Sequence, residues 1–219
     1  MSEALPIDDG DTIAPEDKLL LSALISSRVC HDLINPVGAI TSGLEVLDDP
    51  SMDSSMREAA QDLVRSGAAK AIALLSYARL AYGSAGGFGA QISLDDAKKA
   101  LVDLYATTKA TLDWRLDGGL APKENVKVLL TLAYAAADAI PRGGEVVIEG
   151  DVDNFTLRAT GKKVLLPDDL VRALKGDDIE LSPKFTPAFI ASKLAADRDG
   201  HIEATLVDGE LTFIAKLSG

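Results

Sequence analysis

The stretch ALISSRVCHDLINPVGAITSGLEVL at residues 23–47 decides how the first third of this 219-residue chain folds. Its large apolar side chains recur every three or four residues, which predicts one long amphipathic helix from Pro15 to Leu47. These side chains are Ile25, Val29, Leu33, Val37, Ile40, Leu44 and Leu47. The turn-forming residues 48–51 interrupt the pattern, and a second helix is predicted over 52–82. So short a break predicts an antiparallel helical hairpin.

A hairpin of two helices cannot enclose a core, so each apolar stripe needs another surface to cover it. A symmetric dimer in which two hairpins form a four-helix bundle is the simplest arrangement. If the two helices are of even length, His31 lies roughly opposite Lys70.

Composition limits the classes of function. The net charge of −12 argues against direct binding to nucleic acid, which requires a clustered cationic surface. Residues 1–16 lack the basic and apolar regions of a signal peptide and predict a disordered acidic tail. No apolar stretch is long enough to span a bilayer. Cys30, the only cysteine, cannot form an internal disulfide, so we expect a cytoplasmic protein in which Cys30 is a small buried side chain.

Four glycines among residues 83–89 predict a flexible linker over 83–90, between the hairpin at 17–82 and a second domain at 91–219. In that domain we expect helices at 95–109, 123–140, after Pro167 and at 186–198, and strands at 91–93, 112–116, 145–149, 155–159, 201–206 and 211–215. This order predicts a two-layer α/β sandwich with one helix-covered sheet, and places the chain in the α+β class.

Candidate chemistry lies in the middle of the first helix, at His31, Asp32 and Asn35. Neutral imidazole is a good nucleophile near neutral pH, and a partner that binds one ring nitrogen leaves the other as the attacking atom. Asp32 is the obvious partner. Asn35 is four residues from His31, on the same helical face, where its amide can bind a phosphoryl oxygen or water. Pro36 has no N–H and is expected to disturb the helix just beyond this point.

A surface around His31 is the candidate binding site for another protein. Small or polar residues continue the face of His31 along the first helix, and the facing part of the second helix is also polar. The candidate residues are Ser27, Arg28, Gly38, Ser42, Asp62, Ser66 and Lys70.

The run Cys30-His31-Asp32-Leu33-Ile34-Asn35-Pro36 resembles the H-box of sensor histidine kinases, and a hairpin followed by an α/β domain resembles their dimerisation and ATP-binding domains. The resemblance implies that His31 accepts the phosphoryl group, that Asp32 acts as base and orients the ring, and that Asn35 contributes to phosphoryl handling.

The second domain departs from the kinase pattern at three places. Thr131 and Ala135 occupy the positions of the two N-box asparagines, which removes the magnesium ligand. The segment at 158–164 lacks the aspartate that binds adenine. The loop at 181–187 has prolines and a phenylalanine where kinases have phosphate-binding glycines. We therefore predict an enzyme without ATP-dependent kinase activity and without a cofactor or metal site of its own.

A kinase-like histidine without a nucleotide site resembles the ChpT family of alphaproteobacterial histidine phosphotransferases. That resemblance implies a homodimer that relays phosphoryl groups from the receiver domain of the hybrid kinase CckA to the response regulators CtrA and CpdR. The Mg²⁺ would come from the receiver domain. We expect no ATP, nucleic acid or membrane among its partners.

Two alternatives remain open. A non-catalytic dimeric adaptor would bind response regulators and would tolerate the loss of His31. A diverged ATP-dependent kinase would bind ATP. A Ser-His-Asp hydrolase built on Ser26 or Ser27 is excluded, because adjacent helical positions cannot form the relay and no oxyanion turn is present.

Overall fold

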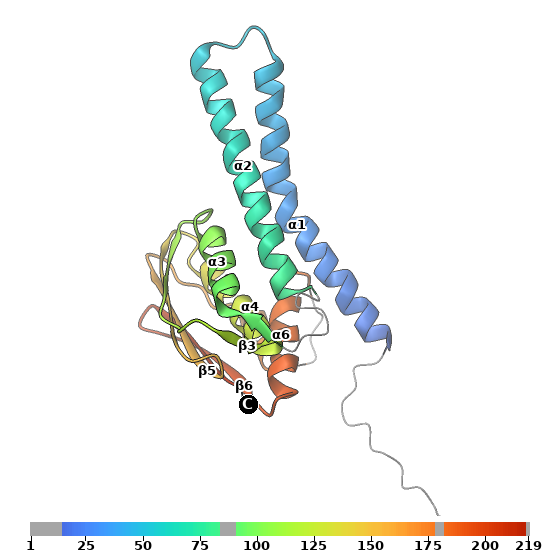
Figure 1. Cartoon of the computed structure of the whole chain (residues 1–219), viewed down its shortest axis with the longest axis vertical. Coiled ribbons are helices and arrows are strands. Elements are labelled where there is room, and N and C mark those ends of the chain that lie inside the picture. The colour runs from blue at the N-terminus through green and yellow to red at the C-terminus, as the bar shows by residue number, and fades with distance from the viewer. Residues whose placement is uncertain (1–14, 84–90, 178–181, 218–219) are drawn as a thin grey trace, which may run out of the picture.

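The computed structural model describes residues 15–83, 91–177 and 182–217. Its most prominent feature is a long helical hairpin, formed by α1 (Pro15–Asp48) and α2 (Ser54–Ala81), that rises from a mixed α/β domain (Figure 1). The hairpin and its bounds confirm the predicted helices to within two residues. The predicted acidic tail lies outside the described residues up to residue 14, and Pro15 and Glu16 already belong to α1.

The turn of the hairpin follows from its sequence. Asp49 accepts hydrogen bonds from the backbone and side chain of Ser51, and the side chain of Asp53 caps α2 by accepting from the Met56 N–H at 2.8 Å. Such an N-cap satisfies one of the N–H groups that a helix leaves unpaired at its start. Pro36 does not end α1, which continues to Asp48.

Two glycines allow the helices of the hairpin to approach closely. A Cβ atom on Gly67 would lie 2.7 Å from the carbonyl oxygen of Pro36, and one on Gly43 would lie 2.9 Å from that of Ala60. These contacts place His31 level with residues near Leu74. The expectation that His31 faces Lys70 is therefore wrong by about one helical turn, because the turn between the helices makes the hairpin uneven.

The α/β domain contains the predicted helices and strands, with bounds that differ by a few residues at most. The helices are α3 (Leu94–Tyr105), α4 (Lys123–Ala139), α5 (Asp168–Leu174) and α6 (Thr186–Ala196), and the strands are β1 (Gln91–Ser93), β2 (Ala110–Trp114), β3 (Leu120–Pro122), β4 (Gly144–Gly150), β5 (Asn154–Gly161), β6 (His201–Val207) and β7 (Glu210–Lys216). Strand β3, which pairs antiparallel with β1, was not predicted, because three residues that end in proline give no strand pattern.

Five strands form the main sheet in the order β2-β4-β5-β7-β6, and only β2 and β4 are parallel. Alternate side chains on the central strands are fully buried, among them Val146, Leu157 and Phe213. The helices cover one face of this sheet, as Figure 1 shows, and the other face is open. The predicted two-layer sandwich is confirmed.

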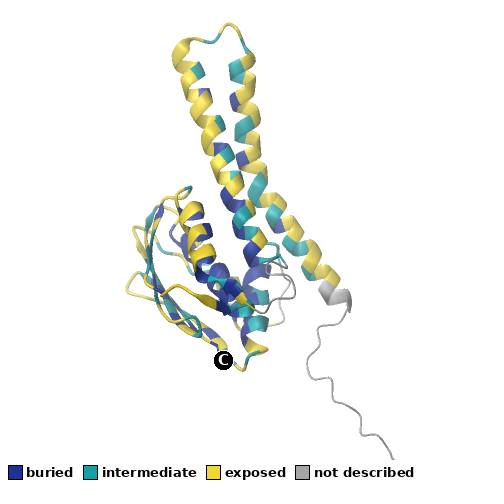
Figure 2. Cartoon of the chain, viewed as in Figure 1, coloured by how far each residue is buried: buried dark blue, intermediate teal, exposed yellow. Residues whose placement is uncertain are grey.

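The hairpin and the α/β domain share one hydrophobic core within the described residues. Leu74, Tyr77 and Leu80 of α2 are buried in the same cluster as Leu101 of α3 and Leu129 of α4. Figure 2 shows the consequence: the half of α2 beside the domain is largely buried, and the far half of the hairpin is largely exposed. The predicted linker at 83–90 lies outside the described residues except for Gly83. The packed core, and not the linker, fixes where the α/β domain sits beside α1.

Candidate functional site

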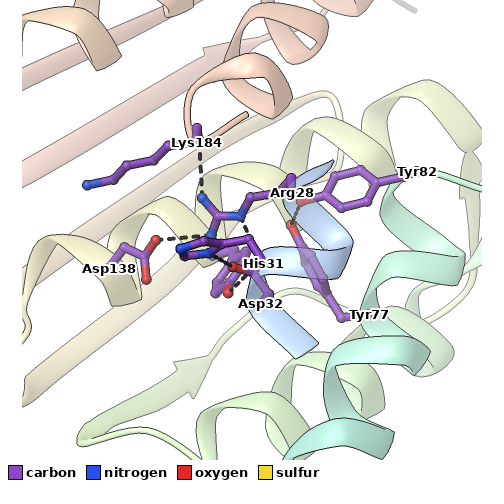
Figure 3. A network of polar contacts seen from close by, with 8 residues as sticks. Arg28, His31, Asp32, Tyr77, Tyr82, Asp138 and Lys184 are labelled. Carbon is purple, nitrogen blue, oxygen red and sulfur yellow. Dashed lines mark hydrogen bonds and ion pairs between the residues drawn. The ribbon is translucent and has the colours of Figure 1, made fainter. Parts of the chain in front are cut away.

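His31 lies on α1 at the level of the α/β domain and presents its ring to solvent. Its side chain is 77% exposed, whereas that of its neighbour Asp32 is 14% exposed. The Nδ1 atom of His31 lies 3.3 Å from Oδ1 of Asp32 (Figure 3). When Nδ1 carries the proton and donates it to this carboxylate, Nε2 retains a free lone pair. The arrangement provides a nucleophilic nitrogen that another molecule can approach.

Asp32 is held from its other side by two donors. Arg28, one turn earlier on α1, donates from Nε to Oδ2 of Asp32 at 2.7 Å. Tyr134 of α4 donates its hydroxyl to the same oxygen at 3.1 Å. Both donors converge on Oδ2, so Oδ1 remains directed at His31. Charge-assisted hydrogen bonds of this kind are stronger than those between neutral groups.

Arg28 connects α1 to the α/β domain. Its guanidinium also donates to the carbonyl oxygen of Lys184 at 3.2 Å and to Asp138 at 3.4 Å, and it stacks 5.0 Å from the ring centre of Tyr134. Burial alone would lower the pKa of Arg28, but the nearby charges of Asp32 and Asp138 and the Tyr134 hydroxyl raise it overall. Arg28 therefore stays charged.

The assignment of Arg28 to the partner-binding surface needs correction, because this residue is only 7% exposed. It lies one turn from Asp32 on the side of α1 that faces α4 and the loop before α6. Its donors are used within the chain. The prediction that Cys30 is a buried side chain is also wrong. Cys30 is exposed, because it lies on a side of α1 away from both α2 and the α/β domain.

Three tyrosines pack together next to the contacts between Arg28 and Asp32. The ring of Tyr77 packs against Tyr134 at 4.9 Å and against Tyr82 at 5.6 Å, both in edge-on geometry. Burial raises the pKa of all three tyrosines, to about 12 for Tyr82. All three are therefore protonated near neutral pH, and Tyr134 acts toward Asp32 as a donor.

The other candidate residues occupy three separate places. Ser27, Asn35, Gly38 and Ser42 are exposed on α1, where helical spacing puts them on the side of His31. Lys70 of α2 lines a groove against Thr107, Thr108 and Lys109 of the α/β domain. Asp62, which pairs with Arg65, and Ser66 are exposed on α2, about two to three helical turns from the level of His31 toward the hairpin tip. The structure brings the α1 residues together with His31, but not Asp62 and Ser66.

Sequence reasoning missed Tyr134, Asp138 and the Lys184 carbonyl, which complete the site. They lie more than 100 residues from Asp32 along the chain. No motif marks them. The only sequence indication was a tyrosine and an aspartate one turn apart in the largely apolar C-terminal half of α4.

A cavity of about 70 Å³ lies where the hairpin meets α4 and α6. Thr131 and Ala135 line it, as do Phe185 and Pro187 of the loop that replaces the glycine-rich phosphate loop of kinases. The Lys184 carbonyl of this loop accepts from Arg28, so the backbone here offers an acceptor to a cation. Sites for drug-sized ligands and cofactors are usually several times larger, about 300 Å³ or more.

The described residues contain no cluster of three or more histidine, cysteine, aspartate or glutamate side chains that could hold a metal ion. None of their helices is both long enough and apolar enough to cross a membrane.

Comparison with known proteins decides the family. The family model for the histidine phosphotransferase C-terminal domain matches residues 94–210, which is more than half of the chain. The protein phosphotransferase ChpT of Brucella abortus (strain 2308) is 38% identical over 160 residues, which cover 71% of this chain and 75% of that protein. This chain belongs to the histidine phosphotransferase family.

Solved structures agree with this membership. A bacterial phosphotransferase solved at 1.7 Å superimposes with a TM-score of 0.81 and 31% identity, over 94% of this chain and 98% of that one. The catalytic domain of the histidine kinase ThkA matches 58% of this chain at a TM-score of 0.44 and 16% identity, too distant to add to the argument. The chain is thus a phosphotransferase with a helical hairpin and an α/β sandwich, as the sequence predicted.

Proposed function

We propose that His31 is the phosphoryl-accepting residue and that the chain relays a phosphoryl group between the aspartates of two receiver domains. The observation that carries this proposal is the exposed imidazole whose Nδ1 faces a firmly held carboxylate. His201, the other histidine of the chain, lies instead on strand β6 beside Glu203, away from this network.

The reaction follows from this geometry. Nε2 of neutral His31 attacks the phosphorus of an aspartyl phosphate, an N–P bond forms, and the P–O bond to the receiver's carboxylate breaks with its electron pair. The proton on Nδ1 stays on the ring, which becomes cationic. Asp32 stabilises that positive charge and keeps the proton on Nδ1. In the second transfer another receiver's aspartate attacks the phosphorus, and the N–P electron pair returns to Nε2.

The partners are proposed to be the receiver domains of a hybrid kinase and of response regulators, and, by the resemblance to ChpT proteins, those of CckA, CtrA and CpdR. Phosphoryl transfer depends mainly on positioning and on positive charge around the phosphoryl oxygens. The receiver supplies Mg²⁺ for this purpose, so the chain needs no cofactor. Ser27, Gly38 and Ser42 provide a surface of small side chains for the receiver, and Asn35 can donate its amide to a phosphoryl oxygen. We further propose that the protein works in the cytoplasm.

A homodimer through the hairpin is part of the proposal. Ile34 of α1 is 67% exposed, and Leu75 of α2 is 52% exposed. Each is two residues, about 200° of helix rotation, from a residue that faces the α/β domain: Asp32 on α1 and Tyr77 on α2. They therefore lie on the opposite side of the hairpin. A second hairpin there would bury these side chains in a four-helix bundle.

The proposal is tested by single-turnover transfer from a radiolabelled, phosphorylated receiver domain. The variant His31→Ala should abolish labelling, and the matched control His201→Ala should transfer like the unmodified protein. Asp32→Asn should slow transfer in both directions by about 10²- to 10⁴-fold, the effect of losing a catalytic acid–base group.

Several outcomes would reject the proposal. Labelling that persists in His31→Ala would move the acceptor elsewhere. Receiver binding without any transfer to the unmodified protein would indicate the adaptor. An unchanged rate in Asp32→Asn would leave Asp32 with a structural role and no role in transfer. Sedimentation that shows a monomer at micromolar concentration would reject the homodimer.

A further inference from the structure

We propose that Tyr134 of the α/β domain is a positioning residue for phosphotransfer, which holds Asp32 so that its free oxygen fixes the proton of His31 on Nδ1. This inference rests on the proposed role of His31. It gives the second domain a part in the reaction, although that domain is remote from His31 in the sequence.

The first step of the argument concerns the two oxygens of Asp32. Oδ2 accepts from both Arg28 at 2.7 Å and the Tyr134 hydroxyl at 3.1 Å, and Oδ1 lies 3.3 Å from the imidazole. The two donors reach Oδ2 from different elements, α1 and α4. Arg28 belongs to the same helix as Asp32, and its guanidinium is itself held by the Lys184 carbonyl and Asp138. Tyr134 is the donor to Asp32 that comes from the α/β domain, so it adds a second direction from which the carboxylate is held.

The second step concerns the rigidity of Tyr134 itself. Its ring is fixed between the guanidinium of Arg28, 5.0 Å from the ring centre, and the buried ring of Tyr77, 4.9 Å away. The raised pKa of Tyr134 keeps its hydroxyl protonated, so it can only donate to the carboxylate. A hydroxyl held in this way limits the rotation of the Asp32 carboxylate, as a hydrogen-bond partner of a metal-bound histidine limits the rotation of its ring.

The third step concerns charge. Arg28 divides its donors among Asp32, Asp138 and the Lys184 carbonyl. One cation therefore serves two carboxylates, Asp32 at 2.7 Å and Asp138 at 3.4 Å. Tyr134 adds a hydrogen bond to Asp32 without adding a second cation. The group of charges next to His31 therefore has a net negative charge, which favours the imidazolium that forms when Nε2 is phosphorylated.

The experiment compares Tyr134→Phe with the matched control Tyr82→Phe in the full chain. The first variant removes a hydroxyl that donates to Asp32, and the second removes a hydroxyl of the same cluster that lies 3.4 Å from the Tyr77 hydroxyl. Neither change leaves a cavity larger than a hydroxyl group. Two quantities are measured: the fraction of His31 that carries its proton on Nδ1, from ¹⁵N NMR of the free protein, and the rate of transfer from a phosphorylated receiver.

We expect Tyr134→Phe to lower the Nδ1-protonated fraction of His31 and to slow the maximal transfer rate by about tenfold, the lower end of the effect of removing an outer partner from a ligating histidine. The receiver concentration at half-maximal rate should not change, because Tyr134 lies behind Asp32 and not on the exposed face. Tyr82→Phe should leave both quantities unchanged. The resonances of His201 report on the fold and should be the same in all three proteins.

The inference is overturned if Tyr134→Phe has the same Nδ1-protonated fraction as Tyr82→Phe, or if transfer slows without any change in that fraction. Failure of the proposed function is recognised separately. Labelling that survives in His31→Ala would reject the role of His31. If His31→Ala loses its labelling but Tyr134→Phe has the transfer rate and the Nδ1-protonated fraction of the unmodified protein, only the role of Tyr134 is rejected.

Discussion

Two glycines of the hairpin give opposite predictions for the same substitution. Gly67 lies where α2 crosses α1, and a methyl group there would be 2.7 Å from the carbonyl oxygen of Pro36 and 3.0 Å from the side chain of Ile40. Gly38 is exposed on α1, and a methyl group there would have no neighbour within 4 Å. Both residues are inside helices, so alanine gains about 1 kcal/mol over glycine at either position.

The expected changes in the free energy of unfolding differ between Gly38→Ala and Gly67→Ala. This gain is common to Gly38→Ala and Gly67→Ala, so the difference between the variants measures the cost of overpacking alone. Overpacking a close contact costs about 1 to 3 kcal/mol, and the backbone oxygen of Pro36 cannot move aside as a flexible side chain would. For a chain of this size 1 kcal/mol corresponds to about 2 to 4 °C in Tm. Gly38→Ala should raise the Tm by about 2 to 4 °C, and Gly67→Ala should melt about 2 to 12 °C below it.

The assay is thermal unfolding followed by far-ultraviolet circular dichroism. All proteins must be at one concentration, because association would make the Tm depend on concentration. If Gly67→Ala melts at or above the temperature of Gly38→Ala, the close crossing of α1 and α2 at Gly67 is wrong, and so is the level of His31 relative to Leu74 that follows from it.

The remaining predictions concern the Arg28 network, the tyrosines and ATP. Arg28→Met keeps the aliphatic stem but leaves Oδ2 of Asp32 with Tyr134 as its donor. Urea unfolding should show a loss of about 3 kcal/mol in the free energy of unfolding, the lower end for breaking a buried ion pair, since Asp32 is still partly hydrated. A loss below about 1 kcal/mol would contradict these contacts of Arg28. Burial raises the pKa of all four tyrosines, to about 12 for Tyr82, above the unfolded value of about 10. Their contribution to stability is therefore complete below about pH 10 and is lost as the pH rises through the folded pKa values, so the native protein should show little tyrosinate absorbance at about pH 10, where the denatured chain is half ionised. Calorimetry with millimolar ATP and Mg²⁺ should give no saturable heat. Labelling of His31 from γ-labelled ATP without another protein would show that the chain is an ATP-dependent kinase.

Local pattern was sufficient for most of the architecture. The spacing of apolar residues from Ile25 to Leu47 favours a long helix, and the short break at 48–51 favours an antiparallel hairpin. In the α/β domain the alternating strands and the turn at Asp208-Gly209, where both residues have positive φ, gave bounds within a few residues of those observed. These features depend on neighbours in the chain, so the sequence alone determined them. Strand β3 was missed because its pairing with β1 gives it a strand conformation that its own three residues do not favour.

The sequence also singled out His31 and Asp32 as a candidate pair, and their contact at 3.3 Å lies within one helix. It could not place Arg28, whose long side chain can lie in solvent or fold back on the protein with similar local energy. Only the packing of α2 against α3 and α4 in one core brings Tyr134, Asp138 and the Lys184 carbonyl to Arg28 and Asp32. The sequence by itself determined which side chain is the candidate nucleophile. The tertiary structure decided which groups hold the neighbouring carboxylate, since those contacts join residues more than 100 positions apart that no local interaction can align.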